Sequence, residues 1–129
     1  MAKAQQRFFI CETCGNMVGL IKDSGSPLVC CGKEMKEMVP NTVDASKEKH
    51  VPVISVDGNV VTVTIGSAPH PMIDAHYIEW VYIQTEKGGQ RKNLYPNDKP
   101  EATFILTDDD KLIAAFEYCN LHGLWKASV

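Results

Sequence analysis

Residues 51–65 read Val51-Pro-Val-Ile-Ser-Val-Asp-Gly-Asn-Val-Val-Thr-Val-Thr-Ile65, which is two β-branched runs around Asp57-Gly58-Asn59. Such runs favour strands, and a glycine between them is typical of a tight hairpin turn. Similar short runs follow, with a second hairpin expected to turn at Gly88-Gly89, and no segment has a helical period longer than two turns. The expected strands therefore continue at residues 78–85, 91–95, 102–106, 112–119 and 124–127. The pattern predicts a mainly β protein whose larger part is an immunoglobulin-like, seven-stranded antiparallel β-sandwich.

The first quarter of the chain is dominated by cysteine rather than by apolar residues. Four of the five cysteines lie between residues 11 and 31, among short apolar pieces separated by glycine and proline. So little apolar material cannot form a core unaided, and a bound metal would have to contribute on the order of 10 kcal/mol to folding. The polar stretch that follows has no periodicity and is the natural linker. We therefore predict a metal-stapled domain at 1–39, a linker at 40–47 and the sandwich domain at 48–129.

Composition narrows the classes of function. The chain has 129 residues, 44% of them hydrophobic, and no run approaches the roughly 20 apolar residues that cross a bilayer. Residues 1–7 lack the apolar core of a signal peptide, so a cytoplasmic location and no membrane partner are expected. In that reducing compartment, an odd number of clustered thiols favours metal ligation over disulfides. A net charge of −3 provides no basic face, so no nucleic-acid partner is expected.

The four early cysteines predict one tetrahedral thiolate site. Cys11 and Cys14 have the spacing at which one tight turn directs two sulfurs at a single ion. Cys30 and Cys31 are adjacent, so the backbone must bend locally before both can bind the same ion. Iron, structural zinc and a strained vicinal disulfide are the alternatives, and the spacing does not separate iron from zinc.

The remaining histidines and cysteine predict a second, nitrogen-rich site. Each lies at an expected strand end or in a loop, where ligands distant in the sequence can converge. Zinc usually takes four ligands, and blue copper sites use two histidines with one cysteine, whereas iron accepts five ligands with a sixth position open. The five candidate ligands are His50, His70, His76, Cys119 and His122.

These residues, read with their neighbours, resemble a known family. The matching segments cover nearly the whole chain: Cys11-x-x-Cys14 with Cys30-Cys31, Glu48-Lys49-His50-Val51-Pro52, His70-Pro71-Met72 with His76, and Glu117-Tyr-Cys119-Asn-Leu-His122-Gly123 with Trp125-Lys126. Together they resemble desulfoferrodoxin, the two-iron form of superoxide reductase, whose first domain is similar to desulforedoxin, a rubredoxin-like protein.

The resemblance implies two iron ions per chain, Fe(Cys)4 and Fe(His)4Cys. Cys11, Cys14, Cys30 and Cys31 would hold the first iron, and the second would have His50, His70, His76 and His122 in its equatorial plane with Cys119 axial. The implied reaction is one-electron reduction of superoxide to hydrogen peroxide at the ferrous second centre, without oxygen release. Two catalytic residues are implied: Lys49 would attract the anion, and Glu48 would occupy the sixth position in the ferric state.

The resemblance also implies partners, namely superoxide as substrate, a rubredoxin-like electron donor and a second copy of the chain in a homodimer. Two rival functions fit the ligand pattern. In one, both centres are electron carriers and no substrate binds. In the other, the chain is a structural zinc protein that acts as an interaction module.

Overall fold

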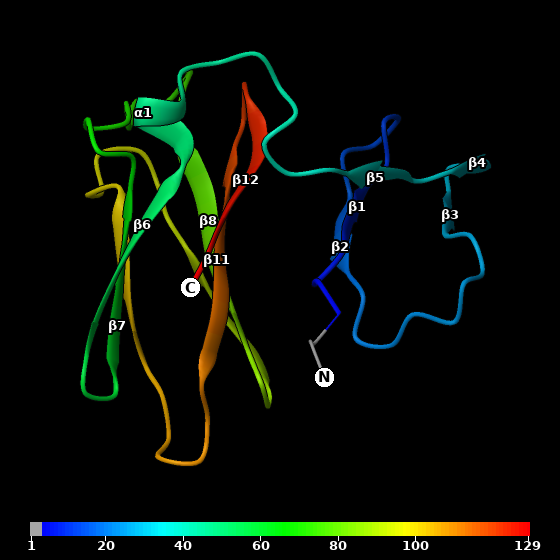
Figure 1. The fold of residues 1–129 in the computed structure, drawn as a ribbon. Helices are drawn as coiled ribbons and strands as arrows, with labels where there is room; N and C mark the ends of the chain where they lie inside the picture. Colours follow the sequence, from blue (N-terminus) through cyan, green and yellow to red (C-terminus); the bar gives the residue numbers. More distant parts are fainter. Residues whose placement is uncertain (1–3) are drawn as a thin grey trace. The chain divides into compact units, whose positions relative to one another are not determined.

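The computed structural model describes residues 4–129 and divides the chain into two compact units (Figure 1). The smaller unit ends at Val39 and the larger runs from Pro40 to Val129. Within the described residues, no helix is long and apolar enough to span a membrane.

The smaller unit is built from very short strands. Three of them, β1 (Phe8–Ile10), β2 (Met17–Gly19) and β5 (Lys36–Met38), form an antiparallel sheet in the order β2-β1-β5. A separate pair, β3 (Val29–Cys30) and β4 (Lys33–Glu34), forms a two-stranded ladder. Among the described residues of this unit, the buried hydrophobic side chains are Phe8, Cys11 and Met35.

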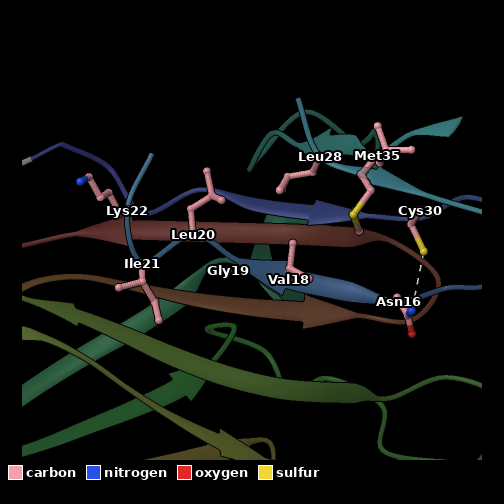
Figure 2. A pocket seen from close by; sticks show the side chains of 10 residues that line it. Asn16, Val18, Gly19, Leu20, Ile21, Lys22, Leu28, Cys30 and Met35 are labelled. Atoms are coloured by element: carbon pink, nitrogen blue, oxygen red, sulfur yellow. Dashed lines mark hydrogen bonds between the residues drawn. The ribbon is translucent and has the colours of Figure 1, made fainter. Parts of the chain in front are cut away.

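An ion pair and an exposed apolar surface accompany this small core. The Arg7 guanidinium donates two 2.9 Å hydrogen bonds to Glu37 and holds the pKa of that carboxyl below its ordinary value. This ion pair ties the residue before β1 to β5. A hollow of about 520 Å³ lies beside β2, and Val18, Leu20 and Leu28 are among its lining side chains (Figure 2). Ile21, which also lines the hollow, is fully exposed. The unit therefore leaves apolar surface in solvent that its own core does not use.

The larger unit contains seven antiparallel strands in two sheets. One sheet has three strands in the order β10-β7-β6, and the other has four in the order β12-β11-β8-β9. Seven strands in two antiparallel sheets confirm the mainly β fold expected from the hydrophobic pattern. The strands are β6 (Pro52–Asp57), β7 (Val60–Ile65), β8 (Ile78–Thr85), β9 (Gly88–Asn93), β10 (Glu101–Ile105), β11 (Leu112–Cys119) and β12 (Gly123–Ser128).

The hydrophobic core lies between these two sheets. On β7, Val61, Val63 and Ile65 are fully buried, and they share one cluster with residues of β8, β10 and β11. Alternate residues of a strand point to opposite faces, so this period of two directs one face of β7 to the other sheet. Cys119, the last residue of β11, belongs to the same cluster. The core thus extends to the end of the sandwich where Cys119, one of the candidate ligands, lies.

The second hairpin turns earlier than the sequence pattern predicts. Its two-residue turn is Glu86-Lys87, and Gly88 and Gly89 already belong to β9. A Cβ at Gly89 would lie 1.9 Å from the Tyr82 hydroxyl oxygen, so the glycine is needed for close cross-strand packing. The predicted turn at Gly88-Gly89 is therefore wrong, because both glycines belong to β9.

Residues 40–47, expected to form a linker, include contacts with the sandwich. The Asn41 amide donates to the Lys126 carbonyl at 3.1 Å, and its oxygen accepts from the Lys126 N–H at 2.9 Å. The single-turn helix α1 (Lys47–His50) then leads into β6. Pro52 disfavours helical backbone at Val51, so this helix ends next to His50.

Candidate metal centres

The four early cysteines converge in the smaller unit. Their four sulfur atoms all lie within 4.8 Å of one another, and they belong to Cys11, Cys14, Cys30 and Cys31. The Cys14 and Cys30 sulfurs are 3.6 Å apart and those of Cys30 and Cys31 are 4.0 Å apart. A tetrahedral ion with metal–sulfur bonds of about 2.3 Å would place its sulfurs about 3.8 Å apart. The donor set therefore fits one tetrahedral metal ion.

Local backbone conformation allows adjacent cysteines to share that ion. Cys31 has φ +54° and Gly32 has φ +73°, so the chain bends in the left-handed region immediately after Cys30. This is the local bending that the Cys-Cys pair required. A vicinal disulfide would need the two sulfurs about 2 Å apart, and both thiols are free.

Hydrogen bonds from the surrounding chain prepare these sulfurs to carry negative charge. The Cys14 N–H donates to the Cys11 sulfur at 3.5 Å, and backbone hydrogen bonds lower the pKa of the Cys11 thiol to about 6. The Asn16 amide donates to the Cys30 sulfur at 3.8 Å (Figure 2). The neighbouring thiols act in the opposite direction and raise the pKa of Cys31 to about 12. A metal ion would remove that conflict, because thiolate is the form that binds.

The four histidines form a square in the larger unit. Neighbouring rings around the square have centroids 4.7 to 5.1 Å apart and are nearly perpendicular, with interplanar angles of 77° to 88°. His50 and His76 stand across a diagonal, 6.4 Å apart. His70 and His122 occupy the other two corners, each beside both His50 and His76. Four imidazoles in this arrangement can supply an equatorial plane of nitrogens.

A buried thiol accompanies the square. The Cys119 side chain is fully buried, and its sulfur lies 4.0 Å from His122 Nδ1. Ring nitrogens of His50, His76 and His122 and the Cys119 sulfur all lie within 4.8 Å of one another, which makes them a three-histidine, one-cysteine cluster. His70 lies outside that mutual limit, but its Nε2 is 3.2 Å from His50 Nε2.

The ligand candidates are positioned by a helix end, a strand end and loops between strands. His50 is the last residue of α1, while His70 and His76 lie between β7 and β8. Two 3.0 Å backbone hydrogen bonds between Ile73 and His76 close that loop. The register of β11 against β8 shifts just before Cys119, and such an irregularity re-aims a side chain.

The hydrogen bonds of the outer ring nitrogens identify which nitrogens face the site. His50 Nδ1 lies 2.6 Å from the Ser46 carbonyl oxygen, and His70 Nδ1 lies 2.6 Å from that of Pro71. A carbonyl only accepts, so both Nδ1 atoms carry the proton and both Nε2 atoms present lone pairs. Two lone pairs 3.2 Å apart cannot bond to each other, whereas a cation between them is stabilised.

The nitrogen of His76 supplies a second test of fit. Its Nε2 is buried without a hydrogen-bond partner in the described part of the chain. A buried polar atom of this kind is costly unless a ligand satisfies it. Two observations therefore fit a metal ion in this cluster: the unpartnered Nε2 of His76, and the facing lone pairs of His50 and His70.

The two predicted catalytic residues lie beside the square on the surface. Glu48 and Lys49 are exposed on α1, directly before His50. Burial is the largest cause that lowers the pKa of His50 and of His76, and the positive charge of Lys49 adds a smaller effect at both residues.

Gly66 fixes the backbone of that segment, a role that the sequence did not reveal. The Ala68 N–H donates to the Glu48 carbonyl at 3.0 Å. A Cβ at Gly66, which has φ +80°, would lie 2.6 Å from the same carbonyl oxygen. Only glycine permits this approach. The stretch Gly66-Ser67-Ala68-Pro69 indicates a turn, but it does not indicate which backbone the turn meets.

Asn120 joins the loop of His76 to the strand of Cys119, and its removal should loosen both. Its side-chain oxygen accepts from the Tyr77 N–H at 3.0 Å, and its amide donates to the Ala75 carbonyl at 3.1 Å. Asn120→Ala should lower the free energy of unfolding by about 1–2 kcal/mol and weaken metal retention at the histidine site. Urea unfolding and metal analysis after dialysis measure the two effects.

Asn41→Gly is the matched control, because Asn41 makes the same two kinds of bond to β12 and glycine tolerates its φ of +63°. It should cost stability without releasing metal. Equal metal loss in both variants would contradict the role of Asn120.

Acidification should empty the histidine site and destabilise the larger unit. Burial lowers the pKa of His50, His76 and His70, that of His70 to about 4. Unfolded histidine takes up its proton near pH 6.5, so between that pH and about 4 the unfolded chain binds more protons than the folded one. The stability held above pH 6.5 is therefore lost as the pH falls, and metal leaves because only neutral imidazole binds it. Urea unfolding and metal content at a series of pH values measure this.

Glu117 opposes that dependence. Its carboxyl is fully buried, both oxygens lack partners within the described residues, and burial raises its pKa well above the ordinary value. Protonation of Glu117 therefore stabilises the folded state as the pH falls. Without it, the free energy of unfolding of Glu117→Gln should fall more steeply with decreasing pH than that of the parent protein. If the free energy of unfolding of both proteins did not change between pH 6.5 and about 4, the histidines would be ruled out as a source of pH-dependent stability.

Known families match nearly the full length of the chain. Residues 3–38 match the family described as Desulfoferrodoxin, N-terminal domain, and residues 42–128 match Desulfoferrodoxin. A protein from Nitratidesulfovibrio vulgaris named desulfoferrodoxin is 46% identical over 123 residues, 95% of this chain and 96% of its own.

Solved structures are similar as well. The superoxide reductase from Treponema pallidum is 42% identical with a TM-score of 0.82, and the match covers 97% of this chain and 100% of that one. A superoxide reductase from Giardia intestinalis, described as 1Fe-SOR, is 31% identical with a TM-score of 0.55. The match covers 64% of this chain and 98% of that one.

Proposed function

Since this chain belongs to the desulfoferrodoxin family and is a superoxide reductase, we propose that iron occupies both of its metal sites. The first iron would be held by the four-cysteine cluster in the smaller unit. The second would take the three-histidine, one-cysteine cluster together with His70, which completes the square of imidazoles. We also propose a domain at 1–39 that carries the first centre, a linker at 40–47, and a domain at 48–129 that carries the second centre.

The square of imidazoles beside one buried thiol is the observation that carries this proposal. Iron in that set would supply the single electron that converts superoxide and two protons into hydrogen peroxide, without oxygen release. The chain's own contribution is to orient the donors. Carbonyls of Ser46 and Pro71 hold two histidines in the tautomer whose Nε2 is free to bind. Burial of Cys119 and of two of the histidines keeps bulk water from those donors.

Lys49 and Glu48 are the proposed catalytic residues. After residue 40 the chain has eight basic and twelve acidic side chains, so its overall field opposes an approaching anion. A lysine whose charge acts on His50 and His76 gives local attraction where the anion must arrive. Glu48 presents a carboxylate from the same exposed turn.

Electrons would come from a rubredoxin-like donor, and the reaction would take place in the cytoplasm. We further propose a homodimer to which the smaller unit contributes. Its small core and the exposed Ile21 beside an apolar hollow support this assignment, because small domains often gain stability by association. Sedimentation equilibrium tests it, and a monomer at every concentration would contradict it.

An anaerobic assay of iron-loaded protein tests the function. Metal analysis should give two irons per chain, and superoxide consumption should yield peroxide without oxygen. Azide or cyanide should change the visible spectrum of the second centre, since a reaction requires an open coordination position. Unchanged spectra would favour the electron-carrier alternative, and a colourless zinc protein would favour the structural one.

A further inference from the structure

One indole side chain contacts two of the proposed iron ligands at once. Trp125 lies on β12, opposite Glu117 of β11, and is 1% exposed. Its partners, His50 and His122, come from opposite ends of the larger unit's sequence. No reaction step above uses this residue.

The first contact fixes the ring of His50. The Trp125 and His50 rings are stacked, with centroids 5.0 Å apart and planes inclined by 25°. The same imidazole is held at Nδ1 by the Ser46 carbonyl. An aromatic plane on one face and a hydrogen bond at the rear leave a single orientation in which Nε2 points into the square.

The second contact fixes the backbone of His122. The indole N–H of Trp125 donates to the His122 carbonyl oxygen at 3.0 Å. His122 precedes Gly123, whose φ of +79° turns the chain into β12, so the carbonyl lies at a sharp bend. A carbonyl held by a buried indole N–H at such a bend limits how far the His122 side chain can move.

Both contacts act on one edge of the square. His50 Nε2 and His122 Nδ1 are neighbours, 3.1 Å apart. We propose that Trp125 is a positioning residue that sets the separation of these two nitrogens and thereby slows metal release from the histidine site. This inference rests on the proposed function only through its ligand set, because it concerns holding the metal and not the reaction with superoxide.

Cobalt release from the full chain tests the proposal without reference to activity. Protein loaded with Co²⁺ at both sites is mixed with excess EDTA, and each site is followed through its own absorption, since four-thiolate and nitrogen-rich cobalt absorb at different energies. Trp125→Phe keeps an aromatic face against His50 but loses the N–H donor, and Trp125→Leu loses both. Trp80→Phe is the matched control, because Trp80 is also buried in this sheet but stacks on Tyr118.

Trp125→Leu should release cobalt from the histidine site about 10- to 100-fold faster than the parent chain, the range usual for groups that orient metal ligands. Trp125→Phe should show an intermediate rate. Release from the four-cysteine site should not change in either variant, and Trp80→Phe should leave both sites unchanged. If Trp125→Leu fails to fold, the intermediate rate of Trp125→Phe carries the test.

Equal release rates for Trp125→Phe, Trp80→Phe and the parent chain would overturn the proposal. A parent chain that binds cobalt only at its cysteines would overturn both the proposal and the ligand set. Normal cobalt kinetics in a protein that does not reduce superoxide would instead refute the function and leave the role of Trp125 intact.

Discussion

Replacing Lys49 with alanine should slow the second-order reaction with superoxide by roughly 10- to 100-fold at low ionic strength. The substrate is an anion, and the part of the chain that holds the histidine site has an excess of acidic residues. The charge of Lys49 acts on both His50 and His76, which places attraction at the site itself. Pulse radiolysis measures the rate constant directly.

Salt separates attraction from any other effect of the substitution. A reaction steered by one local charge slows as ionic strength rises, because exposed charges are screened over about 10 Å at 0.1 M salt. The Lys49→Ala variant should therefore show a flatter salt dependence than the parent protein. Lys47→Ala is the matched control, since it removes the same charge from the same exposed helical turn. An unchanged rate for Lys49→Ala at low salt, or equal losses in both variants, would remove the steering role.

Replacing Cys14 with serine should unfold the smaller unit and leave superoxide reduction largely intact. The exposed Cys14 lies in a four-sulfur cluster, its own sulfur 3.6 Å from that of Cys30. Few apolar residues are buried around it, so a bound metal ion would contribute most of the folding free energy of this unit, on the order of 10 kcal/mol. The expected result is loss of the first centre's visible absorption and of amide-exchange protection in β1, β2 and β5.

The histidine site should survive this change, because its donors all lie in the other compact unit. Thr13→Ser, in the same turn, is the control that changes a side chain without removing a sulfur. Complete loss of activity with the second iron still bound would mean that the first centre is required. Retained absorption would mean that Cys14 is not a ligand.

The strand pattern was predictable because burial in this sandwich follows residue type. On β7, the buried Val61, Val63 and Ile65 alternate with the less buried Thr62 and Thr64, as a half-buried strand requires. The second hairpin was placed wrongly because Gly88-Gly89 has the composition of a turn, whereas its actual role is set by the Tyr82 side chain across the strand. Local composition does not reveal a contact made by another strand.

The candidate ligands were predictable from residue type and spacing. Nine cysteines and histidines at strand ends and loops form a chemical signal that spacing and residue type carry, and the two clusters of the structure are drawn from them. Their roles as ligands, and those of Lys49 and Glu48, remain predictions. Trp125 and Asn120 stand in segments that resemble the family, but neither residue type indicates which contact it makes, and the same holds for Gly66, because an indole, an amide and a glycine suit many positions.

Residue order and chemistry alone indicated a β fold and two groups of metal donors, since periodicity, turn residues and ligand types are local properties. The family was indicated by the resemblance of the quoted motifs. Long-range packing specified the rest. It placed His50 beside His122 from 72 positions away, set the outer hydrogen bonds that free Nε2 for binding, and put Trp125 against both. These properties depend on the directions of side chains from separate strands, and those directions exist only after the two sheets have packed.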